Sequence, residues 1–146
     1  MIRFITENNH PASEWQTSIL NKLKAYNRAK CRWLREHPVL ENTNANFYVF
    51  DEDTLIGGAI GHTEYNWYVL DLLYMDDAYR GQQLGSQLLH RIENFAQKRM
   101  LTGIRLETWN FQAKDFYQKN GYTVFAELND CPPGTTVFFL KKEIHR

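Results

Sequence analysis

One strand–loop–helix segment constrains the fold of this chain more than any other part of the sequence. The apolar run YVLDLLYM at residues 68–75 is followed by YRGQQLGS at residues 79–86 and by the helix-forming run QLLHRIENFAQKRM at residues 87–100. A second run of strand character, GIRLETW, occupies residues 103–109. A helix expected over about 83–100 between two strands predicts a βαβ-like centre of a sheet.

The segments on either side of this centre read as strands with short connections. NFYVFDED at residues 46–53 and TLIGGAIGHTEYNW at residues 54–67 lead into the 68–75 strand with no room for crossover helices, which predicts an antiparallel meander. After the centre come a short helix, FQAKDFYQKN, closed by Gly121, and two strands, YTVFAEL and TVFFLKKEI. The predicted fold class is α+β.

The N-terminal part of the chain predicts a strand followed by helix. IRFIT at residues 2–6 alternates apolar and polar residues, and Pro11 to Ser13 mark a helix start. From Ser13 to about Glu36, apolar residues recur at helical spacing, which indicates an amphipathic helix or helix pair ended by Pro38. With 146 residues, we expect residues 1–146 to form a single domain.

Composition and charge exclude several classes of function. The 17 basic and 17 acidic residues give a net charge of zero, which argues against a nucleic-acid partner but leaves a local basic patch open. Cys31 and Cys131 match no metal or redox pattern and the five histidines are scattered, so no metal is predicted. No apolar run is long enough for a membrane span or a signal segment, so we expect a cytoplasmic protein with no membrane partner.

The glycine loop at residues 79–86 has the chemistry of an anion site. Its spacing matches neither the P-loop nor the dinucleotide fingerprint. It does place a glycine-permissive turn at a helix N-terminus, where amides are unpaired and the dipole is positive. Arg80 adds a cation capable of bidentate phosphate contact, with no acidic residue between it and the helix start. A pyrophosphate fits this loop; an ordinary strand-to-helix turn with a surface arginine is the alternative.

Two segments resemble the GCN5-related N-acetyltransferase (GNAT) superfamily. YMDDAYRGQQLGSQLL resembles its acetyl-CoA-binding motif, with Arg80 at the leading arginine and Gly85 at the last glycine. Gln83 stands where the middle glycine is usual, so its side chain either points outward or narrows the backbone approach to phosphate. NFQAKDFYQKNGY resembles a second family segment, whose matching positions are Asn110, Ala113, Tyr117, Gly121 and Tyr122.

The resemblance implies a fold, a cosubstrate and a binding site. The implied GNAT fold is a mixed, mostly antiparallel sheet with helices on both faces and a central β-α-β core that binds acetyl-CoA. In the family, the strands on either side of the core helix splay apart, so that the backbone of the first strand pairs with the pantetheine arm. The residues that the resemblance assigns to acetyl-CoA are Leu73, Tyr74, Met75, Arg80, Gly81, Gln82, Gln83, Leu84, Gly85, Ser86, Asn110 and Tyr117.

Acetyl transfer to an amine needs a base, a polarised thioester and a proton for the departing thiolate. Tyr117 stands where the family often carries a general-acid tyrosine, so we expect it to protonate the sulfur. For the base, Glu107 is the first candidate and Asp71 the second, since both lie on strands expected to flank the cleft; a water chain is the alternative. His62, Tyr65 and Trp67 are expected to line the acceptor pocket or to form an exposed turn, and Cys131 receives no catalytic role.

The predicted function is transfer of an acetyl group from acetyl-CoA to a primary amine of a small molecule, by direct attack in a ternary complex. Without an accessory domain or an acidic run to attract a basic peptide, a protein tail is the less favoured acceptor. Acetylation of a protein or aminoacyl-tRNA amine and a non-catalytic acyl-CoA-binding module are the alternatives. A homodimer is compatible with the sequence.

Overall fold

The computed structural model describes residues 1–9, 13–37 and 43–144. The chain divides into two compact units, Met1–Leu40 and Glu41–Arg146. Within the described ranges, no helix is long and apolar enough to cross a membrane.

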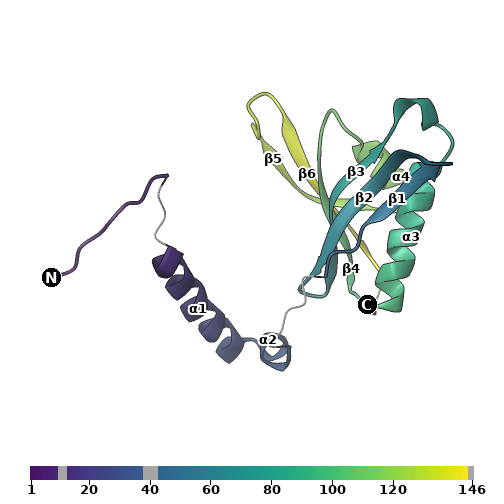
Figure 1. Cartoon of the computed structure of the whole chain (residues 1–146). Coiled ribbons are helices and arrows are strands. Elements are labelled where there is room, and N and C mark those ends of the chain that lie inside the picture. Colours follow the sequence, from purple (N-terminus) through teal and green to yellow (C-terminus); the bar gives the residue numbers. More distant parts are fainter. Residues whose placement is uncertain (10–12, 38–42, 145–146) are drawn as a thin grey trace. The chain divides into compact units, whose positions relative to one another are not determined.

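The first unit is a helix pair (Figure 1). Helix α1 spans Ser13–Lys30 and helix α2 spans Arg32–Glu36. Glu14 in the first turn of α1 and Lys30 in its last turn complement the helix dipole, and Arg32 pairs with Glu36 at 2.6 Å along α2. The predicted helix pair and its start at Ser13 are confirmed, whereas Pro11 and Pro38 lie outside the described residues.

The predicted strand at residues 2–6 is wrong, because residues 1–9 form neither helix nor strand. Alternating apolar residues define the two faces of a strand, but a strand also needs a hydrogen-bonded neighbour. The described elements of this unit are both helical, and they offer no such neighbour.

The second unit is a six-stranded mixed sheet with two α-helices. Its strands are β1 (Phe47–Asp51), β2 (Thr54–Glu64), β3 (Trp67–Met75), β4 (Gly103–Trp109), β5 (Thr123–Asn129) and β6 (Thr136–Glu143). They lie in the order β1-β2-β3-β4-β6-β5. Helix α3 (Leu84–Lys98) joins the parallel pair β3 and β4, and all other pairs are antiparallel. The meander, the βαβ centre and the terminal hairpin are therefore confirmed.

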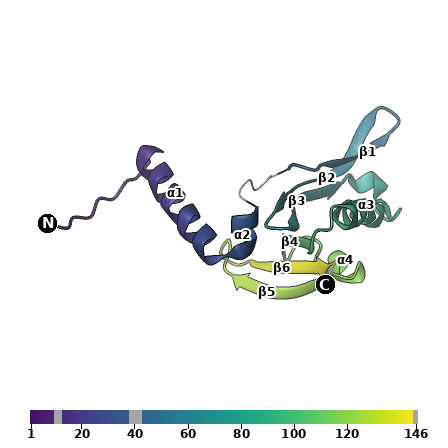
Figure 2. The ribbon, with the colours of Figure 1, turned by 90° about the horizontal axis from the view of Figure 1, so that it is seen from below.

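Helix α3 lies along one face of this sheet and contributes a buried stripe to the core (Figure 2). Leu88, Leu89, Ile92 and Ala96 form its buried stripe at the helical spacing that the sequence shows. The stripe packs on buried residues of the central strands, including Tyr68, Leu70, Ile104, Leu106 and Leu140. Helix α4 (Lys114–Lys119) adds Tyr117 to the same core. This packing fixes both ends of α3 against the sheet.

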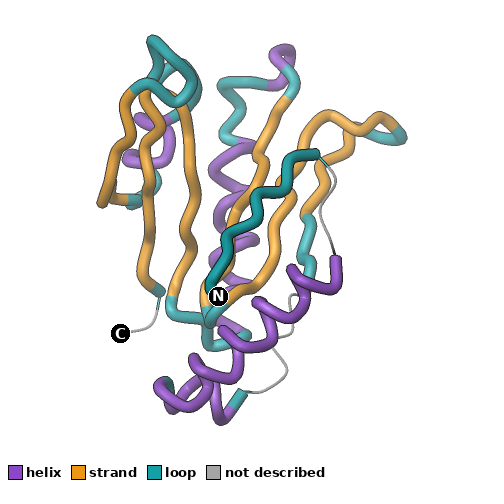
Figure 3. Tube along the Cα trace, turned by 90° about the vertical axis from the view of Figure 1, so that its left-hand side faces the viewer, coloured by secondary structure: helices purple, strands orange, loops and turns teal. Residues whose placement is uncertain are grey.

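Strands β3 and β4 pair over only part of their length. Their parallel ladder runs from Trp67 opposite Gly103 to Leu70 opposite Leu106, while β3 continues to Met75 and β4 to Trp109. The ladder between β2 and β3 shifts register at Asp71, which is left without a paired residue. A bulge of this kind bends its strand, so the bulge accounts for the divergence of β3 from β4 visible in Figure 3.

Candidate active site

The divergence of β3 and β4 opens a hollow of about 170 Å³ on the sheet. Its polar lining consists of Asp71 at the bulge and of Arg105 and Glu107 on β4. Apolar side chains complete it: Val69, Leu70, Leu106, Phe125 and Phe139. The structure thus brings together the two carboxylates that were candidates for the base, although they lie on different strands with helix α3 between them in the sequence.

The β3 edge at this splay carries the three residues assigned to the pantetheine arm. Leu73 is partly buried against the core and Met75 is buried, whereas Tyr74 is exposed. Their side chains thus have ordinary packing or surface roles. Since β4 does not pair with this part of β3, the backbone groups that face β4 are the ones available to an amide-rich ligand.

The glycine loop forms the turn into α3. A 3-10 turn, η1 (Asp77–Tyr79), follows β3, and Gly81 then takes a φ of +80° with open space around its Cα. The first helical hydrogen bond runs from the amide of Gln87 to the carbonyl of Gln83. In an α-helix this leaves the amides of the first turn, here Leu84, Gly85 and Ser86, without intrahelical acceptors. The loop and helix start therefore fit a diphosphate.

Gln83 has a left-handed backbone conformation, with φ 59° and ψ 18°. Glycine adopts this region without steric cost, whereas an L-residue with a side chain does not. This conformation supplies a physical reason for the glycine that the family usually carries here. Gln83 makes no side-chain capping bond to the helix.

Arg80 is not a free cation at this loop. Its Nη1 lies 2.9 Å from Asp77 Oδ1, and its Nε donates to the carbonyl of Met75 at 3.3 Å. Its guanidinium also lies 6.0 Å from the centre of the Tyr74 ring. No acidic residue lies between Arg80 and the helix, but the preceding Asp77 competes with any anion for the guanidinium.

At Gly85, helix α3 lies close to the Phe116 side chain of α4. A Cβ at this position would lie 3.1 Å from the Phe116 ring, which is tighter than ordinary contact. A β-branched residue there would displace Phe116 as well as crowd the amides. A loss of ligand binding in such a variant would therefore report helix packing as well as the diphosphate site.

Tyr117 of α4 lies in the core. Its ring packs edge-on against Phe116 and Tyr122, with centroids 5.2 Å and 5.8 Å away. Burial raises the pKa of Tyr117 to about 12, so the hydroxyl stays protonated at neutral pH. A protonated hydroxyl can donate a hydrogen bond to a developing thiolate.

The ends of β4 and of the β5–β6 hairpin are tied together. The indole Nε1 of Trp109 donates to the carbonyl of Cys131 at 2.7 Å, and Trp109 stacks on Phe111. The amide of Asn110, assigned to the cosubstrate by resemblance, donates to the carbonyl of Thr136 at 3.0 Å. Cys131 itself is exposed.

The three residues proposed for the acceptor pocket separate in the structure. Tyr65 lies in the β2–β3 turn, and Trp67 is the first residue of β3, in the part of the strand that pairs with β4. His62, in contrast, contacts Asp71 of the splay hollow through its Nδ1, at 2.8 Å. Sequence reasoning missed this pairing and that of Arg80 with Asp77; the spacing of three residues was the one available signal for the second.

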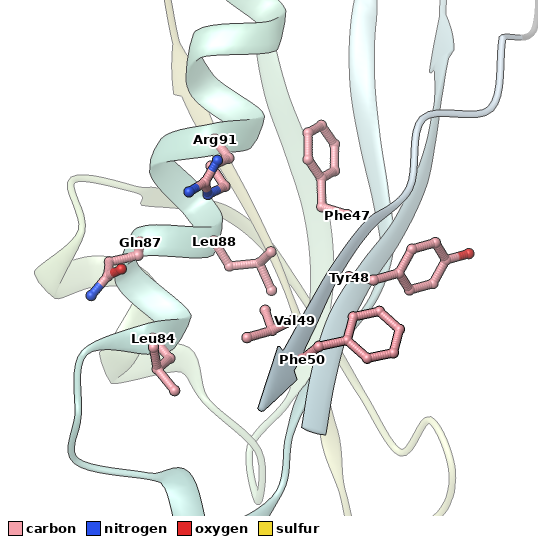
Figure 4. Close-up of a pocket in the computed structure, with 8 residues that line it drawn as sticks. All are labelled: Phe47, Tyr48, Val49, Phe50, Leu84, Gln87, Leu88 and Arg91. Carbon is pink, nitrogen blue, oxygen red and sulfur yellow. The ribbon is translucent and has the colours of Figure 1, made fainter. Parts of the chain in front are cut away.

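A larger hollow, of about 320 Å³, lies between β1 and the first half of α3 (Figure 4). Figure 4 shows Val49 and Leu88 directed toward each other there, with Tyr48 and Phe50 on the other side of β1. Its eight lining residues include no carboxylate, cysteine or histidine. The smaller hollow at the splay, in contrast, is lined by the carboxylates of Asp71 and Glu107.

The splayed parallel pair of strands, the helix start that fits a diphosphate and the two carboxylates that line one hollow are compatible with an acyl-CoA-dependent transferase. The profile of the Acetyltransferase (GNAT) family matches residues 9–122. The chain belongs to this family and is an acetyltransferase that uses acetyl-CoA as its cosubstrate.

Named relatives and solved structures agree with this assignment. Blasticidin-S acetyltransferase of Streptomyces morookaense is 40% identical over 118 residues, covering 77% of this chain and 87% of the relative. An acetyltransferase structure from Bacillus cereus matches with a TM-score of 0.79 at 27% identity, covering 94% of this chain and 97% of that one. A Bacillus anthracis structure named for streptothricin acetylation and solved with acetyl coenzyme A matches with a TM-score of 0.64, covering 70% of this chain and 62% of that one; at 19% identity it supports the fold alone.

Proposed function

We propose that this chain acetylates a primary amine of a small molecule, by direct attack of the amine on acetyl-CoA in a ternary complex. The observation that carries the proposal is the convergence of Asp71 and Glu107 on one hollow of about 170 Å³ beside the unpaired edge of β3. Two carboxylates attract an ammonium group and can take its proton. The name of the Streptomyces morookaense relative supports an antibiotic-like amine as the acceptor.

Each residue of the proposed site has a separate role in the reaction. The amides of Leu84 to Ser86 and Arg80 hold the diphosphate, and the β3 edge at Leu73 to Met75 positions the pantetheine arm. Acetyl-CoA supplies the thioester that the amine attacks. Glu107 and Asp71 receive the ammonium group and remove its proton. Tyr117 donates a hydrogen bond to the sulfur as the thiolate leaves.

In this proposal residues 1–146 act as one acetyltransferase in the cytoplasm. Nucleic acid and membranes are not partners. Acetylation of an aminoacyl-tRNA would require phosphate neutralisation, and the net charge of zero does not favour it. Gln83 has the left-handed backbone that a glycine adopts readily, so the departure from glycine at this position does not favour a non-catalytic binding module.

The test is release of coenzyme A from acetyl-CoA in the presence of a panel of primary amines that includes blasticidin S. We expect turnover with an amine of the panel and a fall in kcat/KM of about a hundredfold in Glu107→Gln, because the variant keeps the shape but loses the charge. Glu127→Gln, on the exposed β5 strand outside the hollow, is the matched control. Acetyl-CoA binding without turnover on any amine would contradict the proposal and favour the binding module.

A further inference from the structure

His62 stands between two carboxylates on the sheet face that bears the splay hollow. Its Nδ1 lies 2.8 Å from Asp71 Oδ2 on β3, and its Nε2 lies 3.6 Å from Glu64 Oε2 on its own strand, β2. Arg105 of β4 holds Glu64 in place, with Nη2 3.0 Å from the same oxygen. Both ring nitrogens therefore lie near a carboxylate oxygen.

The side chains of Asp71 and His62 differ in solvent exposure. The Asp71 side chain is 46% exposed and lines the hollow, whereas the His62 side chain is 25% exposed and is not among the lining residues. An amine in the hollow would thus touch Asp71 first, with His62 behind it. Glu107 is the second carboxylate that lines the hollow. Within residues 43–144, the structure shows no hydrogen bond between Glu107 and the imidazole.

We propose that His62, acting through Asp71, is the group that takes up the proton of the acceptor amine. This inference rests on the proposed function and adds a positioning residue to it. Nothing in the family profile or the names of the relatives assigns a role to this histidine.

Each proton that the acceptor amine loses has a defined destination. In the neutral imidazole of His62 the proton is on Nε2, so Nδ1 can accept a second one. The acceptor ammonium gives one proton to the Asp71 carboxylate, which passes it to Nδ1 of His62 and is again a carboxylate. The freed amine lone pair forms the C–N bond, and the C–S bond breaks. The second N–H proton ends on the sulfur, so the products are an amide, coenzyme A thiol and one proton that the imidazolium releases to solvent.

A carboxylate alone is less suited to removing the proton of the acceptor amine. An exposed carboxylate is a weak base near neutral pH, and a histidine is the side chain whose ordinary titration range matches that pH. The 2.8 Å contact between Nδ1 and Asp71 Oδ2 orients the imidazole. The bulge at Asp71 gives this arrangement its geometry, since the unpaired residue turns toward both the hollow and β2.

The experiment compares wild type with His62→Gln, using the amine on which wild type turns over. The glutamine amide of this variant would still donate a hydrogen bond to Asp71 but could not carry the proton. We expect kcat to fall at least tenfold, the acid limb of the kcat/KM profile against pH to change, and KM for acetyl-CoA to stay within about twofold. His90→Gln, on the exposed side of α3, is the matched control and should behave as wild type.

A second variant separates proton transfer from structural support. In His62→Ala, added imidazoles of increasing base strength should restore turnover in that order, because rate follows basicity in general-base catalysis. Thermal melting of each variant checks the fold, and if His62→Gln fails to fold, His62→Asn replaces it in the same comparison. Wild-type kcat and an unchanged pH profile in the folded variant, or rescue that ignores base strength, would overturn the inference alone. Absence of turnover by wild type on every amine would overturn the proposed function as well.

Discussion

At the scale of single residues, Gln83 has the left-handed backbone of a glycine at a position where the family usually has glycine. Its backbone is left-handed at φ 59°, and it makes no side-chain cap to the helix that it starts. A left-handed L-residue costs roughly 1–2 kcal/mol relative to the right-handed conformation. The chain retains the diphosphate turn at that cost in stability.

Gln83→Gly should therefore raise the free energy of unfolding by about 0.5–1 kcal/mol, because relief of the strained backbone exceeds the extra entropy of glycine in the unfolded chain. Acetyl-CoA affinity should change by less than tenfold, since the amides of the helix start remain in place. Urea unfolding and calorimetry measure the two quantities. Gln82→Gly, at a neighbouring position without positive φ, is the control and should not gain stability.

Tyr117 and Tyr122 form a natural pair for testing a hydroxyl at the thiolate. Tyr117→Phe should lower kcat by about ten- to a thousandfold with little change in acetyl-CoA affinity, because the ring remains and the donor is lost. Tyr122→Phe removes a buried hydroxyl for which the described residues (1–9, 13–37 and 43–144) supply no hydrogen-bond partner. This second variant should keep wild-type kcat and gain about 1 kcal/mol of stability. Equal kcat in wild type and Tyr117→Phe would assign the proton donor to water.

At the scale of elements, the turn η1 controls the cation beside the helix start. Asp77 within η1 holds the Arg80 guanidinium at 2.9 Å, and the Met75 carbonyl at the end of β3 accepts from the Nε of the same side chain. The end of β3 and the turn η1 thus both contact this arginine. Any phosphate that binds must compete with a carboxylate for it.

Asp77→Asn should consequently tighten acetyl-CoA binding by about two- to tenfold, because Arg80 loses its competing charge. Calorimetry at low and at high salt measures the effect, which should shrink as salt screens the anion site. Asp76→Asn removes the same charge one residue away without a pair to Arg80, so it is the matched control. Equal gains in both variants would point to overall charge rather than release of Arg80.

At the scale of the whole molecule, three buried tyrosines make the stability of the fold depend on pH in the alkaline range. Tyr68, Tyr117 and Tyr122 are nearly inaccessible, and burial raises the pKa of each, that of Tyr117 to about 12. Below the ordinary tyrosine pKa of about 10 all three are neutral in folded and unfolded chains, and stability is fully present. Above it the unfolded chain ionises first, so stability falls as pH rises.

We expect the free energy of unfolding to decline between about pH 10 and pH 12 by up to roughly 1.4 kcal/mol per pH unit for each tyrosine. Urea unfolding at a series of pH values, followed alongside phenolate absorbance, measures it. Tyr117→Phe should reduce the slope by the share of one group. Ionisation of these tyrosines before unfolding would show that they are not buried as the fold requires.

The sequence alone determined the features of this protein that depend on neighbouring residues. The helical stripe ending at Ala96 and the glycine turn at Gly81 are local patterns, and they predicted the βαβ centre and its anion site. The tertiary structure decided what depends on pairing across the chain. The bulge at Asp71 arises from the register between β2 and β3. The same register brings Asp71 into contact with His62 on the neighbouring strand. Alternation at residues 2–6 predicted a strand that did not form, because a strand exists only where another strand supplies its hydrogen bonds.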